Sequence, residues 1–341
     1  MAAALAERGL TVDLASFQGT PIRGVRLHRL GDLPPSADRR YLLAILPLAR
    51  LLRRVRPRLV HGHFVSSYGL MTAFAHRLAF PFGGGMPVVQ SPWGSDLLVT
   101  AQRSRLRAAL AALTLRSAAL VTGNSRGLRE QSVRLAPRTP WHRFVWGPHR
   151  SVVEAPRRSE RLALSTRRLE PNMRVDLVVA AFRRACTQAP ETLHGWELIV
   201  THDGSASGTV HAAAEGDPAV RFVGVLKYAE LHRLLLRSAM IISVPVSDAT
   251  SAALMDGLAA GLIPVVNALP GNLEWVDAEI GEVVSRDPSV DELAVAIVRA
   301  AQRSPDAGRI RDRVRDIVWE DEVPRLIEAY EQLAGSLGTG G

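Results

Sequence analysis

Two aspartates, Asp248 and Asp256, stand eight residues apart with the hydroxyl residues Thr250 and Ser251 between them. Carboxylates repel phosphate but accept hydrogen bonds from hydroxyl groups, so this spacing is suited to a ligand that carries sugar hydroxyls on either side of an anion. The alternative interpretation is structural: Asp248 forms a turn or a helix cap, and Asp256 is an exposed helix residue.

The elements around these residues favour the ligand interpretation. Residues 240–245 are apolar and predict a short buried strand, and residues 251–260 are rich in Ala, Leu and Met, which favour a helix that ends at Gly261. A loop at the carboxyl end of such a strand opens onto a ligand crevice, and the helix start presents free N–H groups with partial positive charge. We therefore expect a phosphate or diphosphate at the start of this helix.

The stretch from Ser247 to Val266 resembles the E-x7-E donor-binding motif of the retaining GT-B glycosyltransferases of family 4, in its variant form SDGTSxxLLEAMAxGxPVV. Asp256 stands where that form has Glu, and Ala249 where it has Gly. The resemblance implies that Asp248 holds hexose hydroxyls and Asp256 the ribose. It places Thr250 and Ser251 beside the donor diphosphate.

The segment from Arg167 to Asp176 is similar to the family's GRLxxxKGxD segment, in which Arg and Lys grip the donor diphosphate. Arg168 matches the Arg, and Met173 stands at the Lys position. The resemblance implies that Arg168 and Arg174 supply the two positive charges that stabilise the leaving group, so the expected catalytic residues are Arg168, Arg174 and Asp248. An exposed basic turn is the alternative for this segment.

Two segments of the first half carry the rest of the resemblance, VHGHFVSSYG around His63 and SPWGSD with Trp93 and Asp96. The second matches the WGSD segment of one branch of the family. The resemblance implies that His63, Trp93 and Asp96 line the acceptor side of a cleft, although Trp93 could equally be packed in a turn. His61 and His63 point to the same side of a strand, but no third ligand follows at a spacing typical of metal sites.

Strands and helices alternate along both halves, which predicts an α/β protein with two doubly wound parallel-sheet domains of Rossmann type facing across a cleft, the GT-B fold. We expect an acceptor-side domain at residues 1–152 and a donor domain at 153–318. A helix at 319–336 should pack back on the first domain. In the family a first strand and a glycine-rich loop precede the helix that starts here at Ala2, and both are missing from this sequence.

Composition indicates a globular protein: of 341 residues, 47% are hydrophobic and 22% charged. The net charge of +9 favours acidic partners, and peripheral contact with an anionic membrane is compatible with it. Nucleic acid is not an expected partner, because the arginines are scattered and not interleaved with aromatic residues. Cys186 is the only cysteine, no signal peptide is evident and no apolar run is long enough to span a bilayer, so we expect a cytoplasmic location.

The resemblance implies transfer of a hexose from a nucleoside-diphosphate sugar to a hydroxyl of a sugar, lipid or small-molecule acceptor, with retention at the anomeric carbon. No cofactor or metal is expected, because arginines would neutralise the leaving diphosphate. One alternative is another nucleotide-sugar enzyme on the same scaffold, such as a 2-epimerase or a pseudo-glycosyltransferase. Another is a non-catalytic or partner-dependent subunit. Met173 at the lysine position suggests it, as do Asp248 and Asp256, which are one methylene shorter than glutamate.

Overall fold

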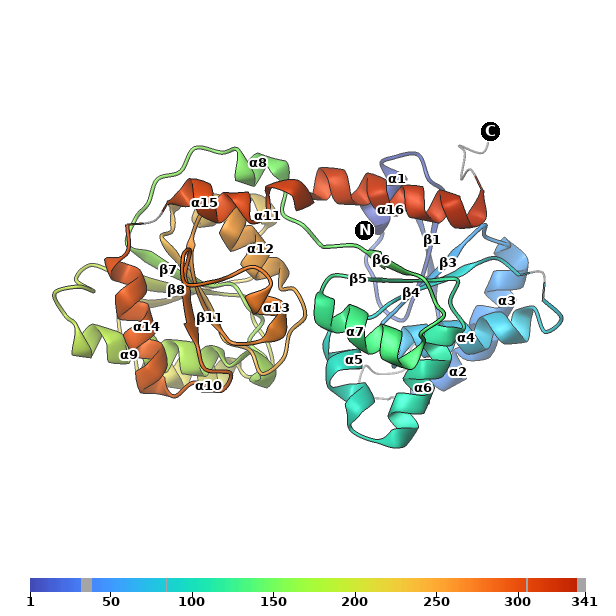
Figure 1. Ribbon diagram of the computed structural model, residues 1–341, viewed down its shortest axis with the longest axis horizontal. Helices are drawn as coiled ribbons and strands as arrows, with labels where there is room; N and C mark the ends of the chain where they lie inside the picture. The colour runs from blue at the N-terminus through green and yellow to red at the C-terminus, as the bar shows by residue number, and fades with distance from the viewer. Residues whose placement is uncertain (32–38, 84, 305, 336–341) are drawn as a thin grey trace. The chain divides into compact units, whose positions relative to one another are not determined.

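The computed structural model describes residues 1–31, 39–83, 85–304 and 306–335. It divides into two compact units (Figure 1). Unit 1 consists of Met1–Val145 and Asp321–Gly341, and unit 2 of Trp146–Glu320.

Unit 1 contains two parallel sheets, a two-stranded sheet with the order β1-β2 and a four-stranded sheet with the order β3-β4-β5-β6. Its strands are β1 (Val12–Ser16), β2 (Val25–Arg29), β3 (Val60–His63), β4 (Val88–Ser91), β5 (Leu120–Gly123) and β6 (Trp141–Arg143). Its helices are α1 (Ala2–Ala6), α2 (Arg39–Leu43), α3 (Ile45–Val55), α4 (Tyr68–Ala79), α5 (Ser95–Leu98), α6 (Arg105–Arg116) and α7 (Arg126–Leu135).

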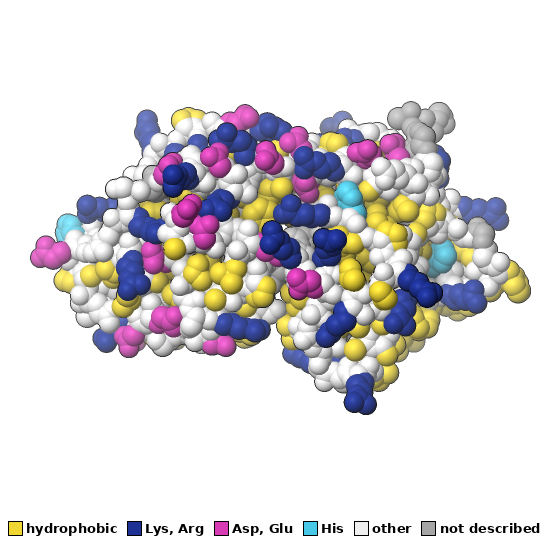
Figure 2. All heavy atoms as spheres, viewed as in Figure 1, with side chains coloured by type: hydrophobic (Ala, Val, Ile, Leu, Met, Phe, Trp, Pro, Cys, Tyr) yellow, Lys and Arg dark blue, Asp and Glu magenta, His cyan; other side chains and the backbone are white. Residues whose placement is uncertain are grey.

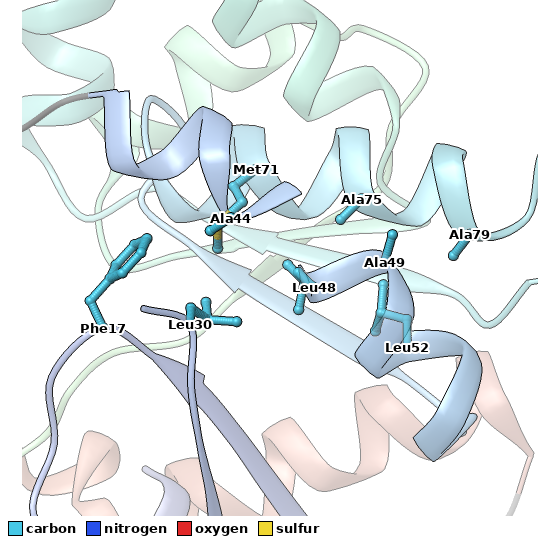
Figure 3. Packing of buried hydrophobic residues seen from close by; sticks show 9 residues of the cluster. All are labelled: Phe17, Leu30, Ala44, Leu48, Ala49, Leu52, Met71, Ala75 and Ala79. Carbon is cyan, nitrogen blue, oxygen red and sulfur yellow. The ribbon is translucent and has the colours of Figure 1, made fainter. Parts of the chain in front are cut away.

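A buried apolar cluster joins α3 and α4 to the chain that follows β1 and β2 (Figure 3). Its members are Phe17, Leu30, Ala44, Leu48, Ala49, Leu52, Met71, Ala75 and Ala79. Small alanines alternate with larger side chains along α3 and α4, so the two helices can approach closely while the larger side chains fill the remaining space. The packing fixes which face of α3 points away from the core.

Unit 2 is built on one six-stranded parallel sheet with the order β12-β11-β10-β7-β8-β9. Its strands are β7 (Leu162–Ser165), β8 (Glu197–Thr201), β9 (Val220–Gly224), β10 (Met240–Ser243), β11 (Ile263–Asn267) and β12 (Glu282–Val284). Helices pack on both faces of this sheet (Figure 1). The helices of unit 2 are α8 (Arg150–Val153), α9 (Val175–Gln188), α10 (Ser207–Ala214), α11 (Tyr228–Arg237), α12 (Ala252–Ala259), α13 (Pro270–Leu273), α14 (Val290–Gln302) and α15 (Ala307–Asp312).

Helix α16 (Trp319–Ala334) starts in unit 2 and continues into unit 1. Within unit 1, the Glu322 carboxylate accepts a hydrogen bond from the Val145 N–H at 2.8 Å, and the Tyr330 hydroxyl lies 2.5 Å from Nδ1 of His61. The helix is therefore tied to unit 1 near its beginning and near its end.

The prediction of two parallel-sheet α/β domains is confirmed. The apolar spacing of residues 39–56 also predicts one amphipathic helix, but that helix is interrupted. Residues 39–56 form α2 and α3, which are separated at Ala44. Pro47 lies in the first turn of α3 and has no N–H to bond the carbonyl four residues earlier, so a single continuous ladder is impossible there. Throughout the described part of the chain, every helix is too short or too polar to span a lipid bilayer.

Candidate active site

The loop between β10 and α12 holds three of the predicted donor-binding residues. Ser251 caps the helix, because its Oγ accepts a hydrogen bond from the Leu254 N–H at 3.3 Å. Among the described residues, nothing accepts a hydrogen bond from the N–H groups of Ala252 and Ala253. The start of α12 therefore retains two backbone donors for a ligand.

This loop opens at the topological switch point of the sheet. From β7 the chain order runs to β8 and β9 on one side, whereas β10 pairs with the other side of β7. The loops that follow β7, β8 and β10 emerge together at the carboxyl edge, since all three strands are parallel. Ligands of open α/β sheets bind at such a point.

Helix α13 and the residues that follow it pack against the loop between β10 and α12. A Cβ added at Gly271 would lie 1.5 Å from the carbonyl oxygen of Ala249, so only glycine allows this approach. The Trp275 indole N–H donates to the hydroxyl of Thr250, which is 7% exposed, at 3.3 Å. The hydroxyl of Thr250 thus serves the packing of the loop in this structure.

Arg167, the first residue of the GRL-like segment, lies against the loop. Its Nη2 is 2.6 Å from Oδ2 of Asp248, and its Nη1 donates to the Ser251 hydroxyl. The same guanidinium donates to the sulfur of Met173 at 2.9 Å. Met173 stands at the position where the family has its lysine. The positive charge next to that position therefore comes from Arg167.

Arg168 and His202 follow β7 and β8 and lie near each other. The Arg168 side chain is 72% exposed, with its guanidinium 3.6 Å from Glu170. Burial lowers the pKa of His202 below its usual value, and the positive charges of Arg168 and Arg167 lower it further. His202 is consequently neutral at pH 7. The side chains of Arg167, Arg168 and His202 thus place three hydrogen-bond donors next to the carboxyl edge of the sheet.

Arg174 braces the protein backbone in this structure. Its guanidinium donates to the carbonyl oxygens of Val244 at 2.8 Å, Pro245 at 3.1 Å and Arg286 at 3.0 Å, and pairs with Asp287 at 3.0 Å. Its backbone has φ of 51°, a left-handed conformation that falls where the family motif has Gly. The structure thus joins Arg174 to the loop that carries Asp248 through main-chain contacts.

Asp256 is half-buried on α12 and has no hydrogen-bond or ion-pair partner among the described residues. Burial raises the pKa of its carboxyl to about 7. Its negative charge also contributes to the raised pKa of Tyr228 on α11. The structure therefore groups Asp248 with Arg167 and Ser251, whereas Asp256 faces Tyr228 and is not the exposed helix residue of the alternative interpretation.

In unit 1, His63 and Trp93 form one hydrogen-bonded pair. The Trp93 indole N–H donates to Nδ1 of His63 at 3.1 Å, and the ring centroids are 5.7 Å apart. Burial lowers the pKa of His63 to about 4. Because Nδ1 accepts, the neutral ring carries its proton on Nε2, and His63 presents a donor there.

Asp96 organises the turns around this pair. Its buried carboxylate accepts hydrogen bonds from the N–H groups of Val65 at 2.8 Å, Trp93 at 3.0 Å and Gly94 at 3.0 Å. Burial nevertheless raises the pKa of Asp96, because desolvation outweighs these bonds. We assign Asp96 to positioning Trp93, a role that needs no contact with a ligand.

His61 stacks on His63 but is engaged elsewhere. The ring centroids are 4.2 Å apart, while Nδ1 of His61 lies 2.5 Å from the Tyr330 hydroxyl and Nε2 lies 2.6 Å from the Ser91 hydroxyl. Both nitrogens of His61 are occupied. In the described ranges, no three His, Cys, Asp or Glu side chains form a group that could hold a metal ion.

Arg167 and His202 were not predicted as site residues. They follow the apolar segments of β7 and β8, whose carboxyl ends meet at the switch point, and that position was the available signal. For Arg167 the alignment of the motif directed attention one residue further, to Arg168, because a motif fixes residue positions but not which of two adjacent side chains turns inward.

Two family models match the chain in succession. Residues 1–125 match the model for Glycosyl transferase 4-like domains, and residues 160–303 match the model for Glycosyl transferases group 1. No curated protein gave a significant match.

Solved structures of glycosyltransferases share the fold at low sequence identity. The sucrose-phosphate synthase from Thermosynechococcus elongatus is 17% identical with a TM-score of 0.75, over 97% of this chain and 91% of that one. Anabaena HepE in complex with UDP and glucose is 15% identical with a TM-score of 0.72, over 98% and 94%. WaaG, a glycosyltransferase involved in lipopolysaccharide biosynthesis, is 14% identical with a TM-score of 0.68, over 98% and 94%. The two matches thus show glycosyltransferase domains at residues 1–125 and 160–303, and the chain has the GT-B fold of these structures.

Proposed function

We propose that the chain transfers a hexose from a nucleoside-diphosphate sugar to an acceptor hydroxyl, with retention at the anomeric carbon. The observation that carries the proposal is the cluster of Arg167, Asp248 and Ser251 at the start of α12. A cation, two backbone donors and a carboxylate adjoin there, which matches the alternation of phosphate and sugar hydroxyls in such a donor. Related structures add support, since HepE was solved with UDP and glucose and the pneumococcal O-GlcNAc transferase GtfA with UDP and GlcNAc.

Different residues of the site would bind different parts of the donor. The N–H groups at the start of α12, Arg167 and the exposed side chain of Arg168 would hold the diphosphate, and Asp248 the hexose hydroxyls. Asp256 would accept from the ribose once its carboxyl is ionised. Arg174 would act on the diphosphate through the loop that it braces, and His63 and Trp93 would contribute to acceptor binding.

The transfer breaks the bond between the anomeric carbon and the diphosphate oxygen and forms one between that carbon and the acceptor oxygen. The acceptor proton passes to the leaving phosphate. Negative charge grows on the diphosphate in the transition state, and preorganised cations and N–H dipoles stabilise such charge most effectively. We propose that side-chain cations do this without a metal or an organic cofactor.

Calorimetric titration of UDP, GDP and dTDP into the purified chain, followed by assay of nucleoside-diphosphate release from the matching sugar donor, tests the proposal. We expect one nucleotide to bind, with affinity about tenfold lower in Asp256→Ala and in Arg168→Ala, or roughly 1.4 kcal/mol. Arg221→Ala, whose side chain pairs with Glu197 on β8, is the control and should bind as the wild type does. Absence of binding for all three nucleotides would overturn the donor site.

A non-catalytic or partner-dependent subunit remains the second candidate, because Met173 replaces the expected lysine and the Arg174 guanidinium is bound to carbonyl oxygens. Nucleotide binding with no turnover, or turnover only when a partner protein is added, would favour it over the transferase. Epimerisation of a donor sugar in the absence of acceptor would instead indicate a 2-epimerase.

A further inference from the structure

A groove of about 420 Å³ lies between β2 and α3 in unit 1, and the described residues that line it include three arginines and no acidic residue. Arg29 lies at the end of β2, and Arg50 and Arg54 lie on α3. Leu30 and Leu51 contribute apolar surface between them. The groove thus combines a cationic rim with an apolar lining.

Helix geometry directs the two arginines of α3 into the groove. Pro47, Arg50 and Arg54 are spaced three and four residues apart, which places them on one helix face. Leu48 and Leu52 belong to another face, where they are buried in the apolar cluster with Leu30 (Figure 3). Because that cluster fixes the orientation of α3, the arginines are held beside β2 whether or not a ligand is present.

In the part of the chain that the structure describes, no negative charge pairs with the three guanidinium groups. Within the described ranges, Arg29, Arg50 and Arg54 form no hydrogen bond and no ion pair. The carboxylate of Asp13 on β1 is already bonded to His28 at 2.6 Å and to Arg26 at 2.7 Å. Like charges gathered in one groove repel each other, so a bound anion would lower the electrostatic free energy.

The surrounding unit is itself strongly basic. Residues 1–145 and 321–341, which form this unit, contain 22 arginines and ten acidic residues. On the face in Figure 2, dark-blue side chains are spread over the part formed by α2 to α7, with few magenta ones between them. An approaching anion is therefore attracted to this unit before it reaches the groove.

We propose that the groove binds a ligand with anionic phosphate oxygens and an apolar portion next to them. Guanidinium groups bind phosphate oxygens in bidentate fashion, and the leucines would contact the apolar portion. The phosphate could belong to a free molecule or to a lipid headgroup, since both present the same oxygens. This site lies in unit 1 on β2 and α3, so it is independent of the donor site proposed in unit 2.

Calorimetric titration with inorganic pyrophosphate tests the shared chemistry, and co-sedimentation with phosphatidylglycerol vesicles against phosphatidylcholine vesicles tests the lipid source. The variants are Arg50→Gln/Arg54→Gln and, as a matched control, Arg105→Gln, an exposed arginine on α6 outside the groove. Pyrophosphate can also enter the donor site. The groove is therefore measured as the binding component that disappears in the double variant and persists in the control.

We expect this component to weaken at least tenfold in the double variant, with an unchanged Tm because both side chains are exposed. Loss of pyrophosphate binding alone identifies a free phosphate ligand, and loss of phosphatidylglycerol binding alone identifies a headgroup; either supports the site. The proposal is overturned if neither probe binds, or if the double variant and Arg105→Gln bind both probes equally well.

Discussion

The guanidinium of Arg167 and the carboxylate of Asp248 form an ion pair 2.6 Å long, with side chains only 11% and 16% exposed. A pair so withdrawn from water adds little net stability, but breaking it leaves a charge without its partner in a poorly solvated place. Before a donor binds, the Arg167 guanidinium is therefore already paired with Asp248 and fixed at the start of α12.

Replacing both members of this pair should destabilise unit 2 by less than the sum of the two single replacements. We expect Asp248→Asn and Arg167→Met each to cost about 2 kcal/mol and the double variant to cost less than their sum, with a coupling of about 1 kcal/mol or more. Differential scanning calorimetry of the four proteins gives the cycle. Strict additivity would show that the two side chains act independently in solution.

Asp256 should make stability and nucleotide affinity depend on pH in opposite directions. Its pKa of about 7 lies above the value in the unfolded chain, so the stability it contributes is full at low pH and is lost as pH rises from about 4 through 7. Relative to Asp256→Asn, the wild type should lose about 2 kcal/mol between pH 5 and pH 8.

The same ionisation creates the acceptor that a ribose hydroxyl needs, so nucleotide affinity of the wild type should rise over this pH interval. Asp256→Asn controls for titration of the nucleotide itself. An identical pH profile for the two proteins, in calorimetric titration, would remove Asp256 from the ribose site.

Arg174 offers a test of bracing against direct phosphate binding. Arg174→Gly removes the side chain and relieves the left-handed backbone, whereas Arg174→Ala removes the side chain and keeps the strain of about 1 kcal/mol that a Cβ causes there. If the guanidinium acts only by holding the loop, each variant should weaken UDP and uridine binding by the same factor. A loss confined to UDP would show that Arg174 contacts the diphosphate, as the resemblance implies.

The His63 ring should be neutral, with its proton on Nε2, down to about pH 4. Trp93→Phe retains an aromatic ring and removes the indole donor, so a larger share of His63 should carry the proton on Nδ1. Long-range ¹⁵N–¹H correlation spectra distinguish the two tautomers. An unchanged tautomer ratio would mean that the Trp93 hydrogen bond does not set it.

The alternation of strands and helices predicted the architecture because each apolar strand of a parallel sheet is bounded by its own turn residues. The loop from Asp248 to Ser251 and helix α12 were predictable for the same reason, with Gly261 as a clear stop. The break at Ala44 was missed, because the apolar spacing of residues 39–56 continues through it, and only the missing N–H of Pro47 interrupts the ladder.

Side-chain roles were harder to predict than elements. Nothing in the order of Arg167 and Arg168 states which guanidinium reaches Asp248, since that depends on how the chain leaves β7. The carbonyl oxygens that bind Arg174 come from loops 70 and 112 residues away in sequence. Such contacts arise only when distant strands are brought to one sheet edge.

The chain leaves unit 1 after Val145 and returns to it at Asp321, and the hydrogen bond from the Val145 N–H to Glu322 keeps the points of exit and return together. Unit 2 is therefore an insertion in the sequence of unit 1, between Val145 and Asp321. If unit 2 were deleted, a short peptide could join Val145 to Asp321, and the entropy cost of closing that loop would be small. The donor-binding half and the arginine groove are therefore separable by one deletion.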